Sequence, residues 1–120
     1  PDLRIKNNDL AAPIDFLAGL EGLIRVHLAE PGFGVDALAD LCGFHRETLN
    51  NRLKPYGQTA SQVIARLRQE IAESLLNEGN KSVGETAQRL GYADPTAFSR
   101  AFRKWTGKSP AGFKRFSREA

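Results

Sequence analysis

Apolar residues recur every three or four positions along most of the chain, which is the period of an amphipathic α-helix. No segment shows the strict alternation that is typical of a β-strand. The pattern therefore predicts an all-α fold with seven helices, separated by turns that contain glycine or proline. The predicted helices begin near Pro13, Val35, His45, Thr59, Ser82, Asp94 and Ser109.

Each predicted helix has an apolar face that we expect to be buried. In chain order, these faces comprise Ile14, Leu17, Leu20, Ile24 and Leu28; Val35, Leu38, Ala39 and Cys42; Leu49 and Leu53; Val63, Ile64, Leu67, Ile71 and Leu75; Val83, Ala87 and Leu90; Phe98, Phe102 and Trp105; and Phe113 and Phe116. The faces together provide enough apolar surface for an ordinary folded core.

Several helix boundaries have recognisable capping residues. Thr59-x-x-Gln62 and Ser82-x-x-Glu85 both match the capping box, in which two side chains bond reciprocally to backbone N–H groups. Asp94 followed by Pro95 is typical of a helix start. The helix that begins near Thr59 continues to Asn77, which gives about 19 residues and a length of roughly 28 Å.

Two parts of the chain repeat each other. Five residues of the first part correspond to residues 48 positions later: Val35, Ala39, Cys42, Gly43 and Phe44 to Val83, Ala87, Leu90, Gly91 and Tyr92. Two more correspond at an offset of 49: Leu49 to Phe98, and Leu53 to Phe102. Each copy has a short helix, a Gly-aromatic turn and a second helix with two large apolar residues, which is the spacing of a helix-turn-helix. The repeat predicts two helix-turn-helix subdomains, at residues 13–57 and 80–120, joined by a linker helix at 58–79. Residues 1–12 are interpreted as a tail or an interdomain linker.

Composition narrows the functional classes. The chain has 120 residues, of which 41% are hydrophobic, and no apolar run approaches the roughly 20 residues of a membrane-spanning helix. One cysteine excludes an intrachain disulfide, and together with two histidines it provides too few ligands for an ordinary zinc site. We expect a cytoplasmic protein without metal or cofactor. His27, His45 and Cys42 match no catalytic spacing, so we do not expect an enzyme.

The net charge of +3 is unevenly distributed. Residues 1–60 contain six Lys or Arg and eight Asp or Glu, a net charge of −2, whereas residues 61–120 contain eleven and six, a net charge of +5. No acid occurs between Phe98 and Arg118, a stretch with seven basic residues. A basic surface supported by aromatic residues indicates a binding partner that is a polyanion, such as nucleic acid.

The segment Ser82 to Phe113, SVGETAQRLGYADPTAFSRAFRKWTGKSPAGF, resembles the DNA-binding region of AraC/XylS-type transcription regulators. The resemblance extends from about Ile14 to Phe116. It implies sequence-specific binding to promoter DNA, usually by an activator that also contacts RNA polymerase. Such domains often follow an effector-binding or dimerisation domain, so any dimerisation is expected through a region absent from this chain.

Residues that read DNA must be exposed near the start of the second helix of each copy. The candidates for base contacts are Arg46, Glu47, Asn50 and Asn51 in the first copy, and Thr96, Ser99 and Arg100 in the second, beside Pro95. Glu47 is equally well explained as an acid favoured by the helix dipole. The candidates for phosphate contacts are Arg52, Lys54, Arg103, Lys104 and Lys108. Ser61 and Ser82 lie near helix starts, where capping is the simpler explanation.

Two other interpretations remain open at this stage. A helical adaptor that binds proteins would explain the helices and the basic face, but not the two copies at nearly identical spacing. A regulator that consists of the double helix-turn-helix alone, without an effector domain, would have the same sequence features.

Overall fold

Helices make up most of the described chain. The computed structural model describes residues 16–79 and 81–119, with side chains as far as Lys114. A first helix at residues 16–27 is followed by α2 (Val35–Cys42), α3 (Arg46–Leu53), the 3-10 helix η1 (Lys54–Tyr56), α4 (Ala60–Asn77), α5 (Val83–Arg89), α6 (Pro95–Thr106) and α7 (Pro110–Glu119). Within the described ranges no β-strand occurs, and the prediction of an all-α fold with seven α-helices is confirmed.

The predicted boundaries agree with the structure to within a few residues. The helix expected from His45 to Lys54 is α3, in which His45 is the N-cap residue and Lys54 begins η1. The predicted start of the first helix at Pro13, its apolar Ile14 and the predicted tail lie outside the described residues. The side chain of Phe116 also lies outside them.

Both predicted capping boxes are confirmed. The Thr59 hydroxyl accepts a hydrogen bond from the Gln62 backbone N–H at 3.2 Å, and the Gln62 side chain accepts one from the Thr59 N–H at 2.9 Å. Ser82 and Glu85 form the same reciprocal pair at the start of α5, at 3.0 and 2.8 Å. These bonds satisfy backbone donors that have no partner within the helix.

The two Gly-aromatic turns have the same backbone geometry. Gly43 and Gly91 both have positive φ angles, of 75° and 85°, which glycine adopts without a Cβ clash. In each turn, the aromatic residue after the glycine donates its N–H to the carbonyl of the alanine at the fourth position before the glycine: Phe44 to Ala39 at 2.9 Å and Tyr92 to Ala87 at 3.0 Å. This bond is the one that defines the Schellman motif. The sequence repeat is therefore also a structural repeat.

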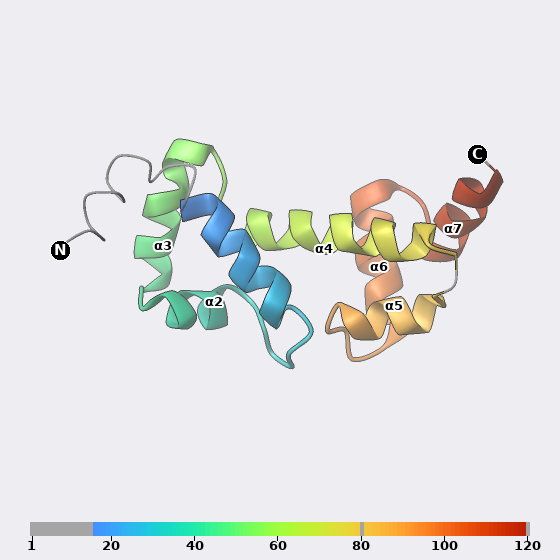
Figure 1. Cartoon of the computed structure of the whole chain (residues 1–120), viewed down its shortest axis with the longest axis horizontal. Coiled ribbons are helices and arrows are strands. Elements are labelled where there is room, and N and C mark those ends of the chain that lie inside the picture. Colours follow the sequence, from blue (N-terminus) through green and yellow to red (C-terminus); the bar gives the residue numbers. More distant parts are fainter. Residues whose placement is uncertain (1–15, 80, 120) are drawn as a thin grey trace.

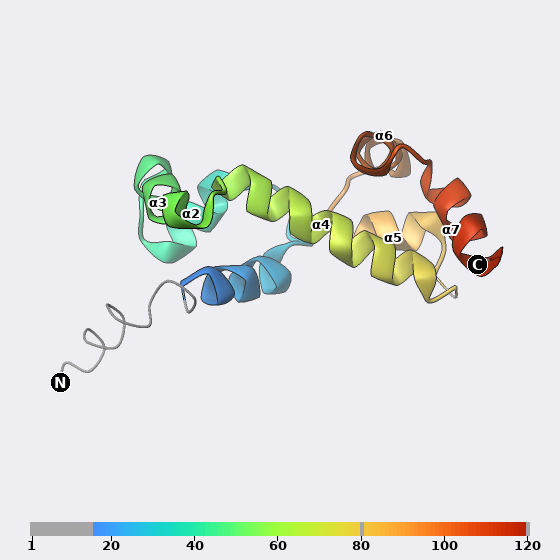
Figure 2. The ribbon, with the colours of Figure 1, turned by 90° about the horizontal axis from the view of Figure 1, so that it is seen from above.

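The two helix-turn-helix units, α2 with α3 and α5 with α6, lie towards opposite ends of the molecule along α4 (Figure 1). The helices α3 and α6 cross the long axis of the molecule in the same direction. Seen from above, α6 lies on one side of α4 and the first helix lies on the other, while α5 overlaps α4 (Figure 2). The second helices of the two units thus run in the same direction across the molecule.

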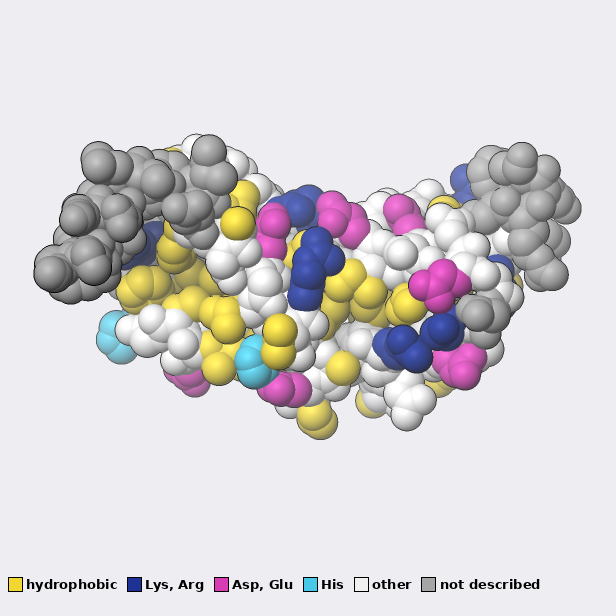
Figure 3. Space-filling model, in the orientation of Figure 1, with side chains coloured by type: hydrophobic (Ala, Val, Ile, Leu, Met, Phe, Trp, Pro, Cys, Tyr) yellow, Lys and Arg dark blue, Asp and Glu magenta, His cyan; other side chains and the backbone are white. Residues whose placement is uncertain are grey.

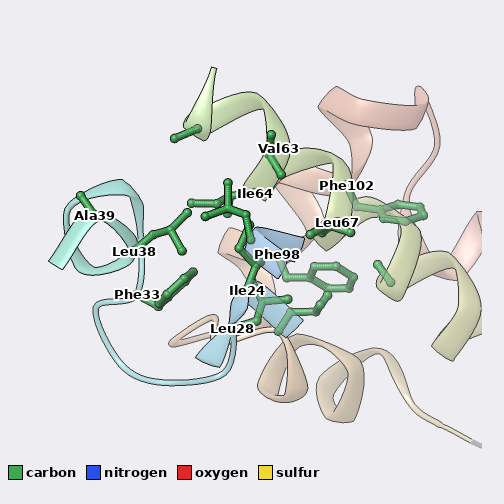
Figure 4. Close-up of a cluster of buried hydrophobic side chains, with 14 of the residues drawn as sticks. Ile24, Leu28, Phe33, Leu38, Ala39, Val63, Ile64, Leu67, Phe98 and Phe102 are labelled. Atoms are coloured by element: carbon green, nitrogen blue, oxygen red, sulfur yellow. The ribbon is translucent and has the colours of Figure 1, made fainter. Parts of the chain in front are cut away.

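One continuous group of buried side chains connects the units. It includes Leu38 and Leu49 from the first unit, Leu67 from α4, and Phe98 and Phe102 from the second unit, all of which are fully buried. Figure 4 shows side chains of the first helix, α2, α4 and α6 gathered in this cluster. The helix α4 contacts α2, α3, α5 and α7, so it supplies core residues to both ends of the molecule.

The buried face of α4 differs from the predicted one in its second half. Val63, Ile64 and Leu67 are buried as expected, but Ile71 and Leu75 are only partly buried. Ala72 and Leu76 are fully buried in their place. A helix that packs on one side only buries a single stripe of apolar residues. Because α4 packs against helices of both units, its buried residues do not follow a single stripe.

Leu75 and Leu76 test which residues of α4 belong to the core. Replacement of Leu76 with alanine should lower the free energy of unfolding by about 2–5 kcal/mol, since it removes a fully buried side chain and leaves a cavity. Replacement of Leu75 should cost markedly less, because that side chain is already partly in water. Urea denaturation of the two variants measures the difference. Equal losses would contradict the assignment of Leu76, rather than Leu75, to the core.

Candidate nucleic-acid interface

The start of α6 is defined by a capping residue and a proline. The Asp94 carboxylate accepts a hydrogen bond from the backbone N–H of Ala97 at 2.9 Å, and Pro95 occupies the first helical position. Phe98 and Phe102 anchor the inner face of the helix in the core, with their ring centroids 5.7 Å apart. The opposite face of α6 is consequently held outward.

Five polar or basic residues share that outward face. They line a single open groove of about 360 Å³: Thr96, Ser99, Arg100, Arg103 and Lys104. All five are predicted DNA contacts, and the structure brings them together. Within the described residues, none of the three cations has an ion-pair partner on the protein. The groove therefore presents positive charge that no described acidic side chain neutralises.

The corresponding face of α3 is more mixed. Glu47, Asn51 and Lys54 are exposed, and so is Thr48, which the sequence prediction missed. Successive residues of a helix are about 100° apart around its axis, so Thr48 lies roughly 100° from the buried Leu49 and roughly 140° from the buried Leu53. Helical geometry alone would therefore have identified it as outward-facing. By position in the repeat, Glu47, Asn51 and Lys54 correspond to Thr96, Arg100 and Arg103 of α6. The two helices thus offer equivalent positions but different chemistry.

Asn50 has a structural contact that explains its place in the middle of a helix. Its side-chain oxygen Oδ1 accepts a hydrogen bond from the backbone N–H of Ala60 at 2.8 Å. Ala60 is fully buried and is the first residue of α4, so its N–H has no partner within that helix. Asn50 therefore fixes α3 against the start of α4, and its carbonyl oxygen is already engaged.

Two arginines of α3 also have partners on the protein. Arg46 lies 3.6 Å from Asp36 of α2, measured between Nε and Oδ1, in an exposed pair. The guanidinium of Arg52 lies 5.0 Å from the ring centroid of Phe16 and 5.1 Å from that of Phe44. A cation at these distances is attracted to the ring faces. Arg52 thus connects α3 to the first helix.

The remaining candidates lie at helix ends. The backbone of Lys108, after α6, is held by the Thr106 hydroxyl, which accepts its N–H at 3.1 Å. Ser61 is exposed in the first turn of α4. Ser82 is engaged in the capping box, and its hydrogen bonds lower the pKa of Glu85. The charged carboxylate of Glu85 already occupies that helix end.

Several basic residues outside α6 are paired with acids. Arg66 of α4 lies 2.7 Å from Glu21 and 3.5 Å from Glu70, and Lys81 lies 3.3 Å from Glu78. Figure 3, which shows the side away from α6, has acidic and basic side chains intermixed. On α6, by contrast, three cations lie together without an acidic partner among the described residues.

Two of the residues considered for catalysis, His27 and Cys42, are in ordinary structural settings. His27 Nδ1 lies 2.7 Å from Glu30 Oε2, and its ring stacks on Phe33 at 6.4 Å between centroids. Burial raises the pKa of the Cys42 thiol, which favours its neutral, less nucleophilic form. Among residues 16–79 and 81–119, no group of three His, Cys, Asp or Glu side chains has the geometry of a metal site. In the same part of the chain, no helix combines the length and apolarity needed to cross a membrane.

Comparisons with known proteins point to one family. A family model described as a helix-turn-helix domain matches residues 25–115. The ornithine utilization regulator of Pseudomonas aeruginosa is 34% identical over 108 residues, which are 88% of this chain and 32% of that protein. The MmsAB operon regulatory protein of the same organism is 33% identical over 104 residues, which are 86% of this chain and 34% of that protein. The chain spans about a third of the length of these relatives.

Solved structures have the same fold. The DNA-binding domain of AdpA, solved with a target DNA, superposes with a TM-score of 0.74 at 31% identity, over 86% of this chain and 93% of that one. A regulator from Chromobacterium violaceum, described as having an AraC-type DNA-binding domain, superposes with a TM-score of 0.73 at 24% identity, over 89% and 96% of the chains. The fold and the exposed face of α6 thus define a helix-turn-helix DNA-binding domain of a transcription regulator. The chain belongs to the AraC-type helix-turn-helix family, as the resemblance of residues 82–113 indicates.

Neighbouring asparagines of α3 separate a structural role from a DNA-binding role. Replacement of Asn50 with alanine should lower the free energy of unfolding by about 1–2 kcal/mol, because the start of α4 loses its capping oxygen. Replacement of the exposed Asn51 should change stability by less than about 0.5 kcal/mol. Thermal unfolding measures both values. An Asn50 variant as stable as the wild type would show that the bond to Ala60 contributes nothing.

Proposed function

We propose that this chain binds double-stranded DNA in a sequence-specific manner by inserting α3 and α6 into adjacent major grooves. The observation that carries the proposal is the outward face of α6, which contains no acid. The turn before α6 has the same backbone geometry as the turn before α3. The helix α4 has 18 residues and a length of about 27 Å, and successive major grooves on one face of DNA are about 34 Å apart. Two helices near the ends of α4 therefore have a suitable separation.

The chemistry of the exposed side chains suggests their roles. Arg100 is proposed to donate two hydrogen bonds to a guanine, because it is an exposed arginine that Thr96 and Ser99 flank in the groove. On α3, Asn51 suits adenine and Glu47 suits the amino group of cytosine. Arg46 is proposed as a further base contact that must leave its exposed pair with Asp36. Asn50 is better supported as a residue that positions α3 than as a base contact, since its oxygen is engaged.

Phosphate contacts are proposed for the remaining exposed cations. Arg103 and Lys104 lie on the same face as Arg100, and Lys54 lies at the end of α3. Lys108 follows α6. Such contacts position a protein on the duplex without reading its sequence. Arg52 is a weaker candidate, because its guanidinium already lies over the rings of Phe16 and Phe44.

The wider biological role is also a proposal. The relatives named above are regulators about three times as long as this chain, and the AdpA domain was solved with its target DNA. We propose that the chain serves in the cytoplasm as the DNA-binding part of an activator that contacts RNA polymerase and acts by binding rather than by catalysis. Dimerisation, where it occurs, would use a region outside this chain.

Two basic residues of α6 should have different effects on DNA binding. Replacement of Arg100 with alanine should weaken binding to the preferred site by about 1–3 kcal/mol and relax the preference at one base pair. Replacement of Lys104 should weaken binding to all sequences alike and reduce the salt dependence of the affinity, since one fewer counterion is released. Fluorescence anisotropy with specific and random duplexes at two salt concentrations measures both effects.

An unchanged affinity of the Arg100 variant for its preferred site would contradict the placement of α6 in a major groove. An affinity for random duplex DNA that does not depend on salt would instead favour the protein-binding adaptor, because binding to phosphates must release counterions.

Selection from a random duplex library tests the use of both helices. We expect recovered sites to contain two short boxes whose centres are about one helical turn apart, or 10–10.5 base pairs. The Asn51→Ala variant should lose the preference within one box only, and Arg100→Ala within the other. Recovery of a single short box by the wild type would mean that only one unit reads DNA.

A further inference from the structure

The first helix packs on the first helix-turn-helix unit through Phe16 and Phe44 and is counted with that unit below. The two units touch at a place that neither α3 nor α6 occupies. There, the turn of the second unit meets the end of the first helix. A Cβ atom placed on Gly91 would lie 2.6 Å from the carbonyl oxygen of Leu28 and 3.4 Å from the Cα of Ala29. Both neighbours are backbone atoms, so no side-chain rotation would relieve the contact. The two units therefore approach each other backbone to backbone.

The equivalent glycine of the first unit has no such neighbour. Gly43 has nearly the same φ angle, 75° against 85°, and it closes the same turn. A Cβ on Gly43 would meet no other atom within 4 Å. The turn itself explains why each position suits glycine. Only at Gly91 does the contact with the other unit add a second requirement.

Arg68 of α4 makes a second connection at the same place. Its Nη2 donates a hydrogen bond at 3.3 Å to the carbonyl of Phe33, in the segment before α2. Its guanidinium carbon lies 5.7 Å from the ring centroid of Tyr92, which directly follows Gly91. One side chain thus contacts a backbone carbonyl next to the first unit and an aromatic ring of the second.

The position of Arg68 has a cost that these contacts offset. Its Nε is buried and, within the described residues, has no hydrogen-bond partner. A buried polar atom without a partner is unfavourable. Beside it, an open hollow of about 340 Å³ separates the units, lined in part by Ser61, Arg68 and Trp105. The units do not touch directly across this hollow. The connection between them therefore depends more on the contacts at Gly91 and Arg68.

We propose that Gly91 and Arg68 are positioning residues that set the separation and relative orientation of α3 and α6, and so determine the spacing between the two DNA boxes that the chain accepts. The proposal rests on the proposed function for its effect on DNA. Neither residue needs to touch a base. Looser coupling would lower the effective concentration of the second unit at its box after the first unit has bound.

The glycine pair provides a matched experiment. Gly91→Ala and Gly43→Ala introduce the same left-handed strain, but only the first adds a clash between units. Affinities are measured for duplexes whose boxes are separated by the selected spacing or by one or two base pairs more or fewer. Gly91→Ala should weaken binding at the selected spacing by about tenfold and flatten the spacing preference, as expected for a looser linkage. Gly43→Ala should retain the wild-type spacing profile.

Arg68→Ala provides a second variant in case Gly91→Ala does not fold. It should also flatten the spacing profile. The control is Arg66→Ala on the same helix, which removes ion pairs to Glu21 and Glu70 but no contact with the second unit. Retention of the wild-type profile by Gly91→Ala or, if that variant does not fold, by Arg68→Ala would overturn the proposal. A wild type without any spacing preference would contradict the proposed function instead.

A measurement without DNA separates the proposal from the proposed function. Spin labels are attached to cysteines at the exposed positions Asp40 and Arg89, one on each unit, in a Cys42→Ser background. Double electron–electron resonance should give one narrow distance distribution for this protein and for the same protein with Gly43→Ala. Gly91→Ala or Arg68→Ala should broaden or shift it. An unchanged distribution in both of these variants would overturn the proposal whatever the DNA results.

Discussion

The burial of apolar residues along α4 is the constraint on which the rest of this structure depends. A helix-turn-helix unit of about 40 residues is too small to bury enough surface for a stable fold by itself. The residues Leu67 and Leu76 of α4, together with the first helix, extend the core of each unit into the other. Because both units share this core, α3 and α6 are parts of one body.

That shared core explains the polarity of the surface. Phe98 and Phe102 hold one side of α6 inside, which forces Arg100 and its basic neighbours outward. Elsewhere, cations such as Arg66 are paired with acids of the first helix and of α4. Three cations without an acidic partner among the described residues thus lie together on a helix whose direction is set by buried aromatic residues. The chain can bind a polyanion there without rearranging its own ion pairs.

Much of the fold was predictable from the sequence because it depends on local interactions. The capping boxes at Thr59 and Ser82 and the glycine turns at Gly43 and Gly91 each involve residues close together in the chain. The exposed face of α6 was predictable for the same reason, since Phe98 and Phe102 define its inner side. The spacing of its apolar residues identifies the inner side of a helix, whatever that side packs against.

Other features depend on contacts between distant segments. Which leucine at the end of α4 is buried depends on how the helices of both units pack, which the apolar stripe does not specify. Asn50 resembles a base contact in sequence, but the fold places its oxygen against the N–H of Ala60, ten residues later. The approach of Gly91 to Leu28 and the bridge made by Arg68 join segments 63 and 35 residues apart, and neither has a local sequence signal.

The central claim is that one copy of this rigid chain reads two adjacent grooves on one face of the duplex. Hydroxyl-radical footprinting of a complex with one chain per duplex, on the site recovered by selection, tests it most directly. The structure predicts two protected patches on the same face, about 10 base pairs apart. A single patch, or a second patch that appears only when a second chain binds, would contradict the claim.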